Sequence, residues 1–296
     1  IKRIVEDTQE VKKALLKRVL RSELHLEEIV ELEKERKELQ TEYDKKRAEQ
    51  NEYNDQMAKL DKGSEAFNSL IKELKEKSDE IKKVEENLKE KERKIQELIE
   101  VLPNIPDDDV PADGKAYNKI VGTSGEKPKF DFEPKDHLEL GESLGILDFE
   151  RASKISGANF SMYRGKGAQL EWALLNYFID SHLSDGYEMV IPPHIVNENS
   201  AYAAGQLPKF KDDVYWVEHD QCLIPTAETS LTNIYRDEIL EEKDLPQKFF
   251  AYTPCYRREA GSYRANERGL IRVHQFNKVE MYAFTKQQQS DEVFEE

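Results

Sequence analysis

The chain has 296 residues and a formal net charge of −16, and 36% of its residues are charged. This length allows two domains, and the acidic balance excludes binding of nucleic acid through overall charge, so such binding needs a local basic surface. Two cysteines, Cys222 and Cys255, exclude a disulfide framework and fit a reducing compartment, which predicts a cytoplasmic protein. The sequence shows neither an apolar run of membrane-spanning length nor a signal-peptide pattern at its start.

The first hundred residues predict two long antiparallel helices. After a short helical lead-in, apolar residues recur on alternating three- and four-residue steps over 29–60 and again over 67–102. Ser64 stands between the two runs as the expected N-cap of the second helix, and Pro103 ends that helix. A hairpin this thin has no room for a catalytic pocket, so residues 1–102 form an arm, either a spacer or dimerising coiled coil or a binding arm.

The next segment, 103–130, is rich in Pro, Asp, Gly and Lys, which predicts an irregular linker. Its acidic run Asp107-Asp108-Asp109 is either a metal site or a solvated acidic turn. The remaining residues, 131–296, predict a second domain of mixed helices and strands.

Helices and strands alternate in the second domain. One apolar face over 167–183 predicts an amphipathic helix, and 187–193 predicts a strand that ends in two prolines. A further helix is expected over 230–240, just after Thr226-Ala227-Glu228. Thr followed by Glu is by itself no more than a helix-start signal, so a binding role for this tripeptide is the competing interpretation.

The most informative stretch is TPCYRREAGSYRANERGLIRVHQFNKVEMY, at 253–282. Its apolar flanks, 249–256 and 270–284, predict an antiparallel hairpin joined by a polar connection at 261–269. Charged residues gather around the turn: Arg257, Arg258, Glu259, Arg264, Arg268 and Arg272. Such a cluster of cations is costly unless it meets anions, and the planar guanidinium fork suits phosphate. The hairpin is therefore either a triphosphate clamp or a solvated, charged ribbon.

The segments CYRREAG and RGLIRVHQFNKVE resemble motif 2 of the class II aminoacyl-tRNA synthetases, in the form found in seryl-tRNA synthetases. Further segments resemble the same family: HLELG at 137–141, a strand of the family at 148–160, GQLPKF at 205–210 and PTAE at 225–228. The helix over 167–183 with Pro193 resembles class II motif 1. The resemblance implies an α+β fold, in which an N-terminal antiparallel helical hairpin precedes a class II antiparallel sheet flanked by helices.

The resemblance also implies an activity. A serine–tRNA ligase activates L-serine with ATP and Mg²⁺ to seryl-adenylate, and transfers the serine to the 3′ end of tRNA(Ser) and also of tRNA(Sec). The arm would contact the long variable arm of the tRNA, and the motif 1 region would form a homodimer. The alternatives are a catalytically incomplete paralogue that binds RNA or another partner, and a coiled-coil interaction protein with a vestigial domain.

Motif 2 implies residue roles. Arg257, on the α-phosphate, and Arg272, on the γ-phosphate, are the expected catalytic groups, and Phe276 would stack on adenine. The expected ATP-binding set is Arg257, Arg258, Glu259, Arg272, Val273, His274, Gln275 and Phe276, and the expected serine-binding set is Thr226, Ala227, Glu228, Arg257 and Glu280. Arg264 and Arg268 are candidates for contacting the tRNA acceptor end, or are ordinary surface arginines. A packed strand histidine is the competing interpretation of His274, and no metal ligands are expected in the chain itself.

The sequence departs from the family at two points. Arg258 stands where bacterial members usually carry serine. The later acidic ATP segment and motif 3 are not among the 296 residues, so we expect a fragment of a longer protein that by itself does not form the adenylate at a useful rate.

Overall fold

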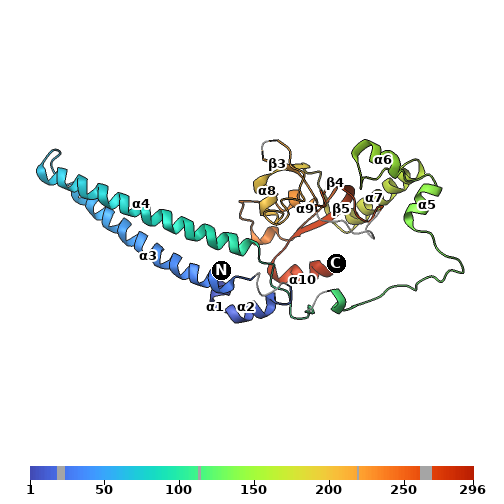
Figure 1. The fold of residues 1–296 in the computed structure, drawn as a ribbon, viewed down its shortest axis with the longest axis horizontal. Helices are drawn as coiled ribbons and strands as arrows, with labels where there is room; N and C mark the ends of the chain where they lie inside the picture. Colours follow the sequence, from blue (N-terminus) through green and yellow to red (C-terminus); the bar gives the residue numbers. More distant parts are fainter. Residues whose placement is uncertain (19–23, 113–114, 219, 261–268) are drawn as a thin grey trace. The chain divides into compact units, whose positions relative to one another are not determined.

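A computed structural model describes residues 1–18, 24–112, 115–218, 220–260 and 269–296 (Figure 1). The chain divides into two compact units, Ile1–Glu126 (unit 1) and Lys127–Glu296 (unit 2). The chain combines a long helical hairpin in unit 1 with a small mixed sheet and helices in unit 2, which confirms the predicted α+β fold class. No helix among the described residues is long and apolar enough to cross a membrane.

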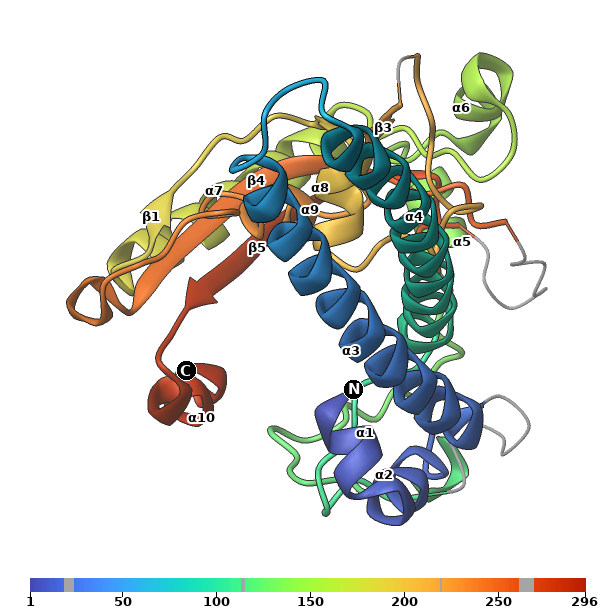
Figure 2. The same ribbon diagram turned by 90° about the vertical axis from the view of Figure 1, so that its left-hand side faces the viewer.

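The arm of unit 1 consists of α3 (Leu26–Met57) and α4 (Glu65–Glu100), which lie side by side (Figures 1 and 2). The expected N-cap is confirmed, because the Ser64 hydroxyl accepts a hydrogen bond from the Phe67 amide at 3.1 Å. A cap of this kind satisfies one of the free amides at a helix start.

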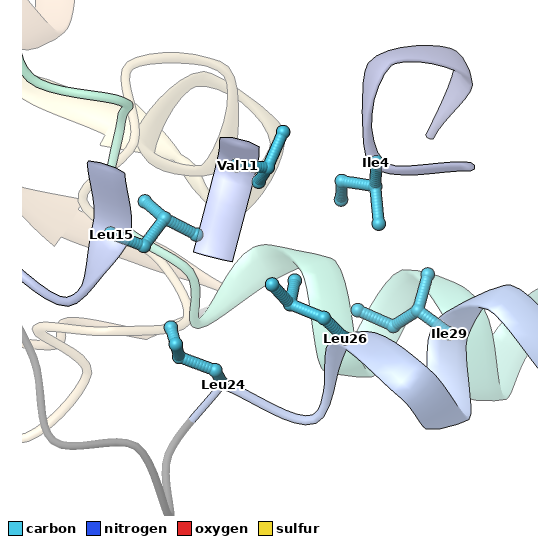
Figure 3. Close-up of a cluster of buried hydrophobic side chains, with 6 residues drawn as sticks. All are labelled: Ile4, Val11, Leu15, Leu24, Leu26 and Ile29. Atoms are coloured by element: carbon cyan, nitrogen blue, oxygen red, sulfur yellow. The ribbon is translucent and has the colours of Figure 1, made fainter. Parts of the chain in front are cut away.

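The helical lead-in is two short helices, α1 (Lys2–Glu6) and α2 (Thr8–Leu15), which pack against the base of α3 (Figure 3). Their apolar side chains form one buried cluster with the start of the arm: Ile4, Val11, Leu15, Leu24, Leu26 and Ile29. Removing apolar surface from water stabilises a fold by about 25 cal/mol per Å², so this cluster stabilises the packing of α1 and α2 on the base of the arm.

Polar residues at apolar positions of the repeat make cross-helix ion pairs. Lys46 pairs with Glu80 at 2.7 Å, and Lys77 pairs with Glu49 at 2.8 Å. Buried residues of α3 end at Glu33, so the outer half of the hairpin relies on such partly exposed pairs and on half-buried apolar contacts. Exposed ion pairs contribute little each, up to about 1 kcal/mol, which makes the outer arm the less stable half.

Between the arm and unit 2 the described residues are irregular apart from η2 (Lys115–Tyr117). The acidic run is an exposed turn, and Lys17 donates from its ammonium to the carbonyls of Asp107 (3.3 Å) and Asp108 (3.0 Å). No group of three or more His, Cys, Asp or Glu in the described part of the chain is arranged to hold a metal ion. The exposure of this turn and its contacts with Lys17 fit the interpretation of the acidic run as a solvated turn.

Unit 2 is built on a three-stranded sheet of order β1-β4-β5. β1 (Glu188–Met189) runs parallel to β4 (Gln247–Tyr256), and β4 pairs antiparallel with β5 (Gln275–Phe284). A small second sheet pairs β2 (Ile195–Asn197) with β3 (Gln221–Leu223). The long helix α7 (Lys166–Ser184) packs on all three strands of the larger sheet. The shorter helices of unit 2 are α5 (His137–Ser143), α6 (Phe149–Ser156), α8 (Glu198–Ala203), α9 (Glu228–Leu231), η3 (Glu242–Asp244), η4 (Gln287–Gln289) and α10 (Ser290–Glu295).

Two local expectations are wrong. Residues 148–160, expected as a strand, contain α6, because Asp148 caps a helix by accepting from the Arg151 amide at 3.0 Å and Gly157 ends it at a φ of 99°. The expected helix over 230–240 stops at Leu231 with α9. There the side-chain Nδ2 of Asn233 donates to the backbone carbonyls of Ser200 and Thr229, which competes with helical hydrogen bonding, and Asp237 takes a positive φ.

Two expected strands are shorter than predicted. β1 has only two residues because Pro192 and Pro193, which follow it closely, have no amide to donate to a strand ladder. β5 begins at Gln275, where its pairing with Tyr256 starts, and not at Leu270.

Candidate functional site

The site lies at the end of the β4–β5 hairpin. In the register of the two strands Cys255 stands opposite Phe276 and Ala251 opposite Glu280. Because side chains two positions apart on a strand share a face, Phe276, Lys278 and Glu280 lie in a row on one face of β5.

Two cavities meet at this end. The first, of about 290 Å³, is lined among the described residues by Gln206, Phe210, Asp213, Val214, Pro225, Thr226, Glu228, Arg257, Glu259, Arg272 and Lys278. The second, of about 490 Å³, is lined by Arg257, Glu259, Leu270, Ile271, Arg272, Val273 and Phe276. Both linings contain Arg257, Glu259 and Arg272, so the predicted phosphate-binding arginines face one shared space.

A polar cluster joins β5 to the predicted TAE segment. The Thr226 hydroxyl donates to Oε2 of Glu280, and the Glu228 amide lies 3.3 Å from the same oxygen. The Lys278 ammonium lies 2.8 Å from the Thr226 hydroxyl and 2.6 Å from Glu280 Oε2. Ala227 is fully buried in an apolar cluster with Leu231 and Ala251, so its methyl group belongs to the core. The cluster sets one carboxylate beside a hydroxyl at the edge of the first cavity.

Arg257 is held on two sides. Its Nε donates to the carbonyl of Pro225 at 3.3 Å, and its guanidinium lies over the ring of Phe276, 5.0 Å from the ring centre. Arg272 makes an ion pair with Glu259. The side chain of Glu259 is 11% exposed, against 43% for Arg272, so the carboxylate forms the inner member of that pair. Two guanidiniums thus converge on the shared space, one of them beside a carboxylate.

The loop of the hairpin is anchored at both of its bases. The Arg258 and Ala260 amides donate to the Asp213 backbone oxygen (2.8 Å) and side-chain oxygen (2.7 Å). On the other side the Leu270 amide donates to Nε2 of His137 at 3.1 Å. These contacts fix where Arg257 and Arg272 leave the two strands.

Several predicted residues stand apart from the cavities. Among the residues that the structure describes, Arg258, His274, Gln275, Ala227 and Glu280 are absent from both linings, although Glu280 touches Thr226. Val273 is buried and lines the second cavity.

The prediction for His274 can be compared with the structure, whereas those for Arg264 and Arg268 cannot. The His274 ring packs 5.1 Å from the Phe160 ring and 6.5 Å from the Tyr215 ring, and its Nδ1 lies 3.0 Å from the Arg257 carbonyl oxygen. That environment suits a packed histidine, which lies one residue before the start of β5. Arg264 and Arg268 lie outside the described residues.

Both cysteines are poor nucleophiles. Burial raises the pKa of the Cys255 thiol, and burial also raises the pKa of the Cys222 thiol. Because the thiolate is the reactive form, neither group supports covalent catalysis.

Lys278, Asp213 and His137 also belong to the site, although the motif resemblance did not mark them as site residues. Lys278 was recognisable in principle, since it stands two residues before Glu280 on a predicted strand and so shares its face. Asp213 and His137 act through contacts between segments distant in sequence, which no local pattern reveals.

Comparison with known proteins gives two family matches. Residues 1–106 match the "Seryl-tRNA synthetase N-terminal domain", and residues 210–296 match the "tRNA synthetase class II core domain (G, H, P, S and T)". "Serine--tRNA ligase 2" of Clostridium acetobutylicum is 49% identical over 300 residues, which covers 99% of this chain and 70% of that protein. "Serine--tRNA ligase" of Desulforapulum autotrophicum is 45% identical and is covered to 67%.

A solved structure is also similar. The crystal structure of seryl-tRNA synthetase from Pyrococcus horikoshii complexed with ATP superposes with a TM-score of 0.87 at 31% identity. The alignment covers 99% of this chain and 71% of that one.

Proposed function

The chain belongs to the seryl-tRNA synthetase family of aminoacyl-tRNA ligases, and from that premise we propose that the paired cavities of unit 2 bind ATP and L-serine for adenylate formation. The observation that carries the proposal is that Arg257, Arg272 and Thr226 line one cavity, with Glu280 hydrogen bonded to Thr226. A hydroxyl at the 3′ end of tRNA(Ser) then attacks the seryl carbonyl of the adenylate, an ester bond forms, and the acyl–phosphate bond breaks with release of AMP. We propose tRNA(Sec) as the second acceptor.

The reaction joins two anions. An oxygen of the serine carboxylate attacks the α-phosphorus of ATP, a P–O bond forms, and the bond to pyrophosphate breaks with the electron pair leaving on pyrophosphate. Positioning and charge neutralisation supply the catalysis, since no side-chain nucleophile is required. In this proposal Arg257 neutralises the α-phosphate and Arg272 the far end of the triphosphate.

Contacts around the arginines support these roles. Arg257 is fixed by the Pro225 carbonyl and by Phe276, so little reorganisation is needed when charge develops. Glu259 holds Arg272 and is the proposed acceptor for the adenine amino group. Phe276 offers a ring for stacking, and Val273 forms part of the same wall. Arg258, His274 and Gln275 are proposed to contribute through backbone and packing.

Magnesium is proposed to arrive on the triphosphate. Mg²⁺ usually keeps several waters and binds through substrate phosphates with one or two carboxylates. When bound, the ion supplies charge neutralisation at the pyrophosphate.

Serine recognition is assigned to the cluster on β5. The substrate ammonium needs an acidic partner, and Glu280 provides a carboxylate that is only 16% exposed. Thr226 and the Glu228 amide place polar groups around it. A site built for a hydroxyl rejects alanine because its polar groups would be left unpaired.

Unit 1 is proposed as the tRNA-binding arm, on the strength of the N-terminal domain match. Homodimer formation is assigned to α7, which exposes large apolar side chains, including Leu170 (65%), Trp172 (55%) and Tyr177 (67%). Buried free thiols fit the reducing cytoplasm, where we place the reaction. Arg264 and Arg268 remain the proposed contacts to the tRNA acceptor end.

Serine-dependent exchange of pyrophosphate into ATP tests the proposal. The intact protein is expected to catalyse exchange with L-serine, far less with L-threonine, and not with L-alanine. A polypeptide of these 296 residues alone is expected to be inactive, because no third class II motif is among them. An intact protein without serine-dependent exchange that still binds tRNA would support the incomplete paralogue instead.

A further inference from the structure

We propose that Lys278 is a positioning residue for the serine subsite, which fixes the Thr226 hydroxyl and with it orients the Glu280 carboxylate for the substrate ammonium. The inference rests on the proposed function and adds to it a residue that the motif assignment leaves out. Lys278 lies on β5 two positions before Glu280, so both side chains project from one face of the strand.

Hydrogen bonds around Thr226 are complete in the described part of the chain. The hydroxyl donates to Glu280, and it accepts from the Lys278 ammonium at 2.8 Å and from the Glu228 amide at 3.3 Å. A hydroxyl has one hydrogen to donate and two lone pairs to accept with. The rotation of the Thr226 hydroxyl is therefore fixed, by the Lys278 ammonium as much as by the Glu280 carboxylate.

Contacts on Glu280 converge on a single oxygen. Within the described residues the Thr226 hydroxyl, the Glu228 amide and the Lys278 ammonium all bond to Oε2, the last at 2.6 Å. A carboxylate has two oxygens and about four acceptor positions. Holding Oε2 sets the plane of the carboxylate, and in this proposal Oε1 is the oxygen that accepts from the substrate ammonium.

A fixed cation is needed here for an electrostatic reason. The Glu280 and Lys278 side chains are only 16% and 30% exposed, so an unpaired carboxylate at this position would be poorly solvated. Lys278 also lines the first cavity beside Arg257 and Thr226. The lysine that pairs with Glu280 thus also borders the cavity in which we propose that the substrate binds.

The test compares serine and ATP kinetics in the intact protein by pyrophosphate exchange. K278M removes the charge and keeps the length of the side chain. The expected result is a rise in the KM for serine of about ten- to a hundredfold, the size expected from losing hydrogen bonds to a charged group, with the KM for ATP unchanged. K278R, which keeps the charge, is expected to recover most of the loss. If K278M fails to fold, K278Q gives the same readout.

The matched control is K286M, since Lys286 is 29% exposed and ion-paired with Glu242 at 3.3 Å but lines neither cavity. It is expected to leave both KM values unchanged. An equal rise in both KM values, or no change in either, would overturn the positioning role. A fall in the KM for serine would also overturn it, because the ammonium of Lys278 would then be occupying the substrate's place. Absence of serine-dependent pyrophosphate exchange in the wild-type protein would instead contradict the proposed function.

Discussion

Arg257 lies over Phe276, with its guanidinium carbon 5.0 Å from the ring centre. The two residues are distant in sequence, and the β4–β5 register brings them together because Cys255 pairs with Phe276. A guanidinium in this position gains a cation–π contact of about 0.5–2 kcal/mol. Together with its bond to the Pro225 carbonyl, the contact holds Arg257 in place before any substrate arrives.

Replacing Arg257 with lysine should therefore reduce the rate of adenylate formation strongly, even though the positive charge is kept. R257K keeps the positive charge but loses the planar fork that can bond the Pro225 carbonyl and phosphate together. We expect serine-dependent pyrophosphate exchange to fall about a hundredfold or more, the size typical of losing one transition-state donor. R236K is the control, since Arg236 bonds to Ser200 and Asn233 outside both cavity linings. Equal losses in both variants would refute the special role of Arg257.

Gly269 gives a prediction about the base of the hairpin loop. Its φ is +72°, and a Cβ there would lie 2.2 Å from His137 Nε2 and 2.6 Å from Leu138 Cδ2. G269A should displace the segment before β5 that carries Arg272 and raise the KM for ATP. G145A is the matched control, because Gly145 has a φ of +68° with nothing within 4 Å of a Cβ.

Urea unfolding separates backbone strain from the clash at Gly269. Both variants should lose about 1–2 kcal/mol of unfolding free energy from the left-handed backbone, and G269A should lose about 1–3 kcal/mol more from overpacking. Equal losses, with an unchanged KM for ATP, would mean that the contact with His137 does not position the loop.

Sequence patterns located the arm well because its signals are local. The Ser64 cap depends on a residue only three positions away, and the apolar repeat continues through each helix. The repeat could not reveal the partner of each polar residue that stands at an apolar position of the repeat. Lys46 and Lys77 pair with glutamates 34 and 28 residues away, on the other helix, and only the alignment of the two helices determines those pairs.

In unit 2 the motif residues were identifiable by resemblance, whereas their surroundings were not. Arg257, Arg272 and Thr226 do line one cavity. The interpretation of 148–160 as a strand failed because a capping aspartate outweighed the expected extended pattern. Lys278 was overlooked because its importance comes from Thr226, 52 residues earlier in the chain.

The Ser64 cap should be measurable as stability of the arm. S64A removes the acceptor of the Phe67 amide, and such substitutions cost about 1 kcal/mol. S78A is the control, since Ser78 lies exposed inside α4, where alanine is the better helix former. Thermal unfolding followed by circular dichroism at the helical wavelength should show a lower midpoint for S64A only. A midpoint for S64A equal to that of S78A would show that the cap contributes nothing.

Glu33 should make the arm sensitive to acid. The buried carboxylate accepts two hydrogen bonds from Arg36, at 2.7 and 3.0 Å, and this pairing lowers the pKa of Glu33 below its ordinary value. Its stabilising contribution is therefore complete above the ordinary pKa of the unfolded chain and is lost as pH falls through the lowered folded value. E33Q should have a lower thermal midpoint than wild type at neutral pH, and the gap should close on acidification. E38Q, at an exposed position of the same helix, should have the same thermal midpoint as wild type at each pH. A difference in midpoint between E33Q and wild type that stays constant with pH would rule out the linkage.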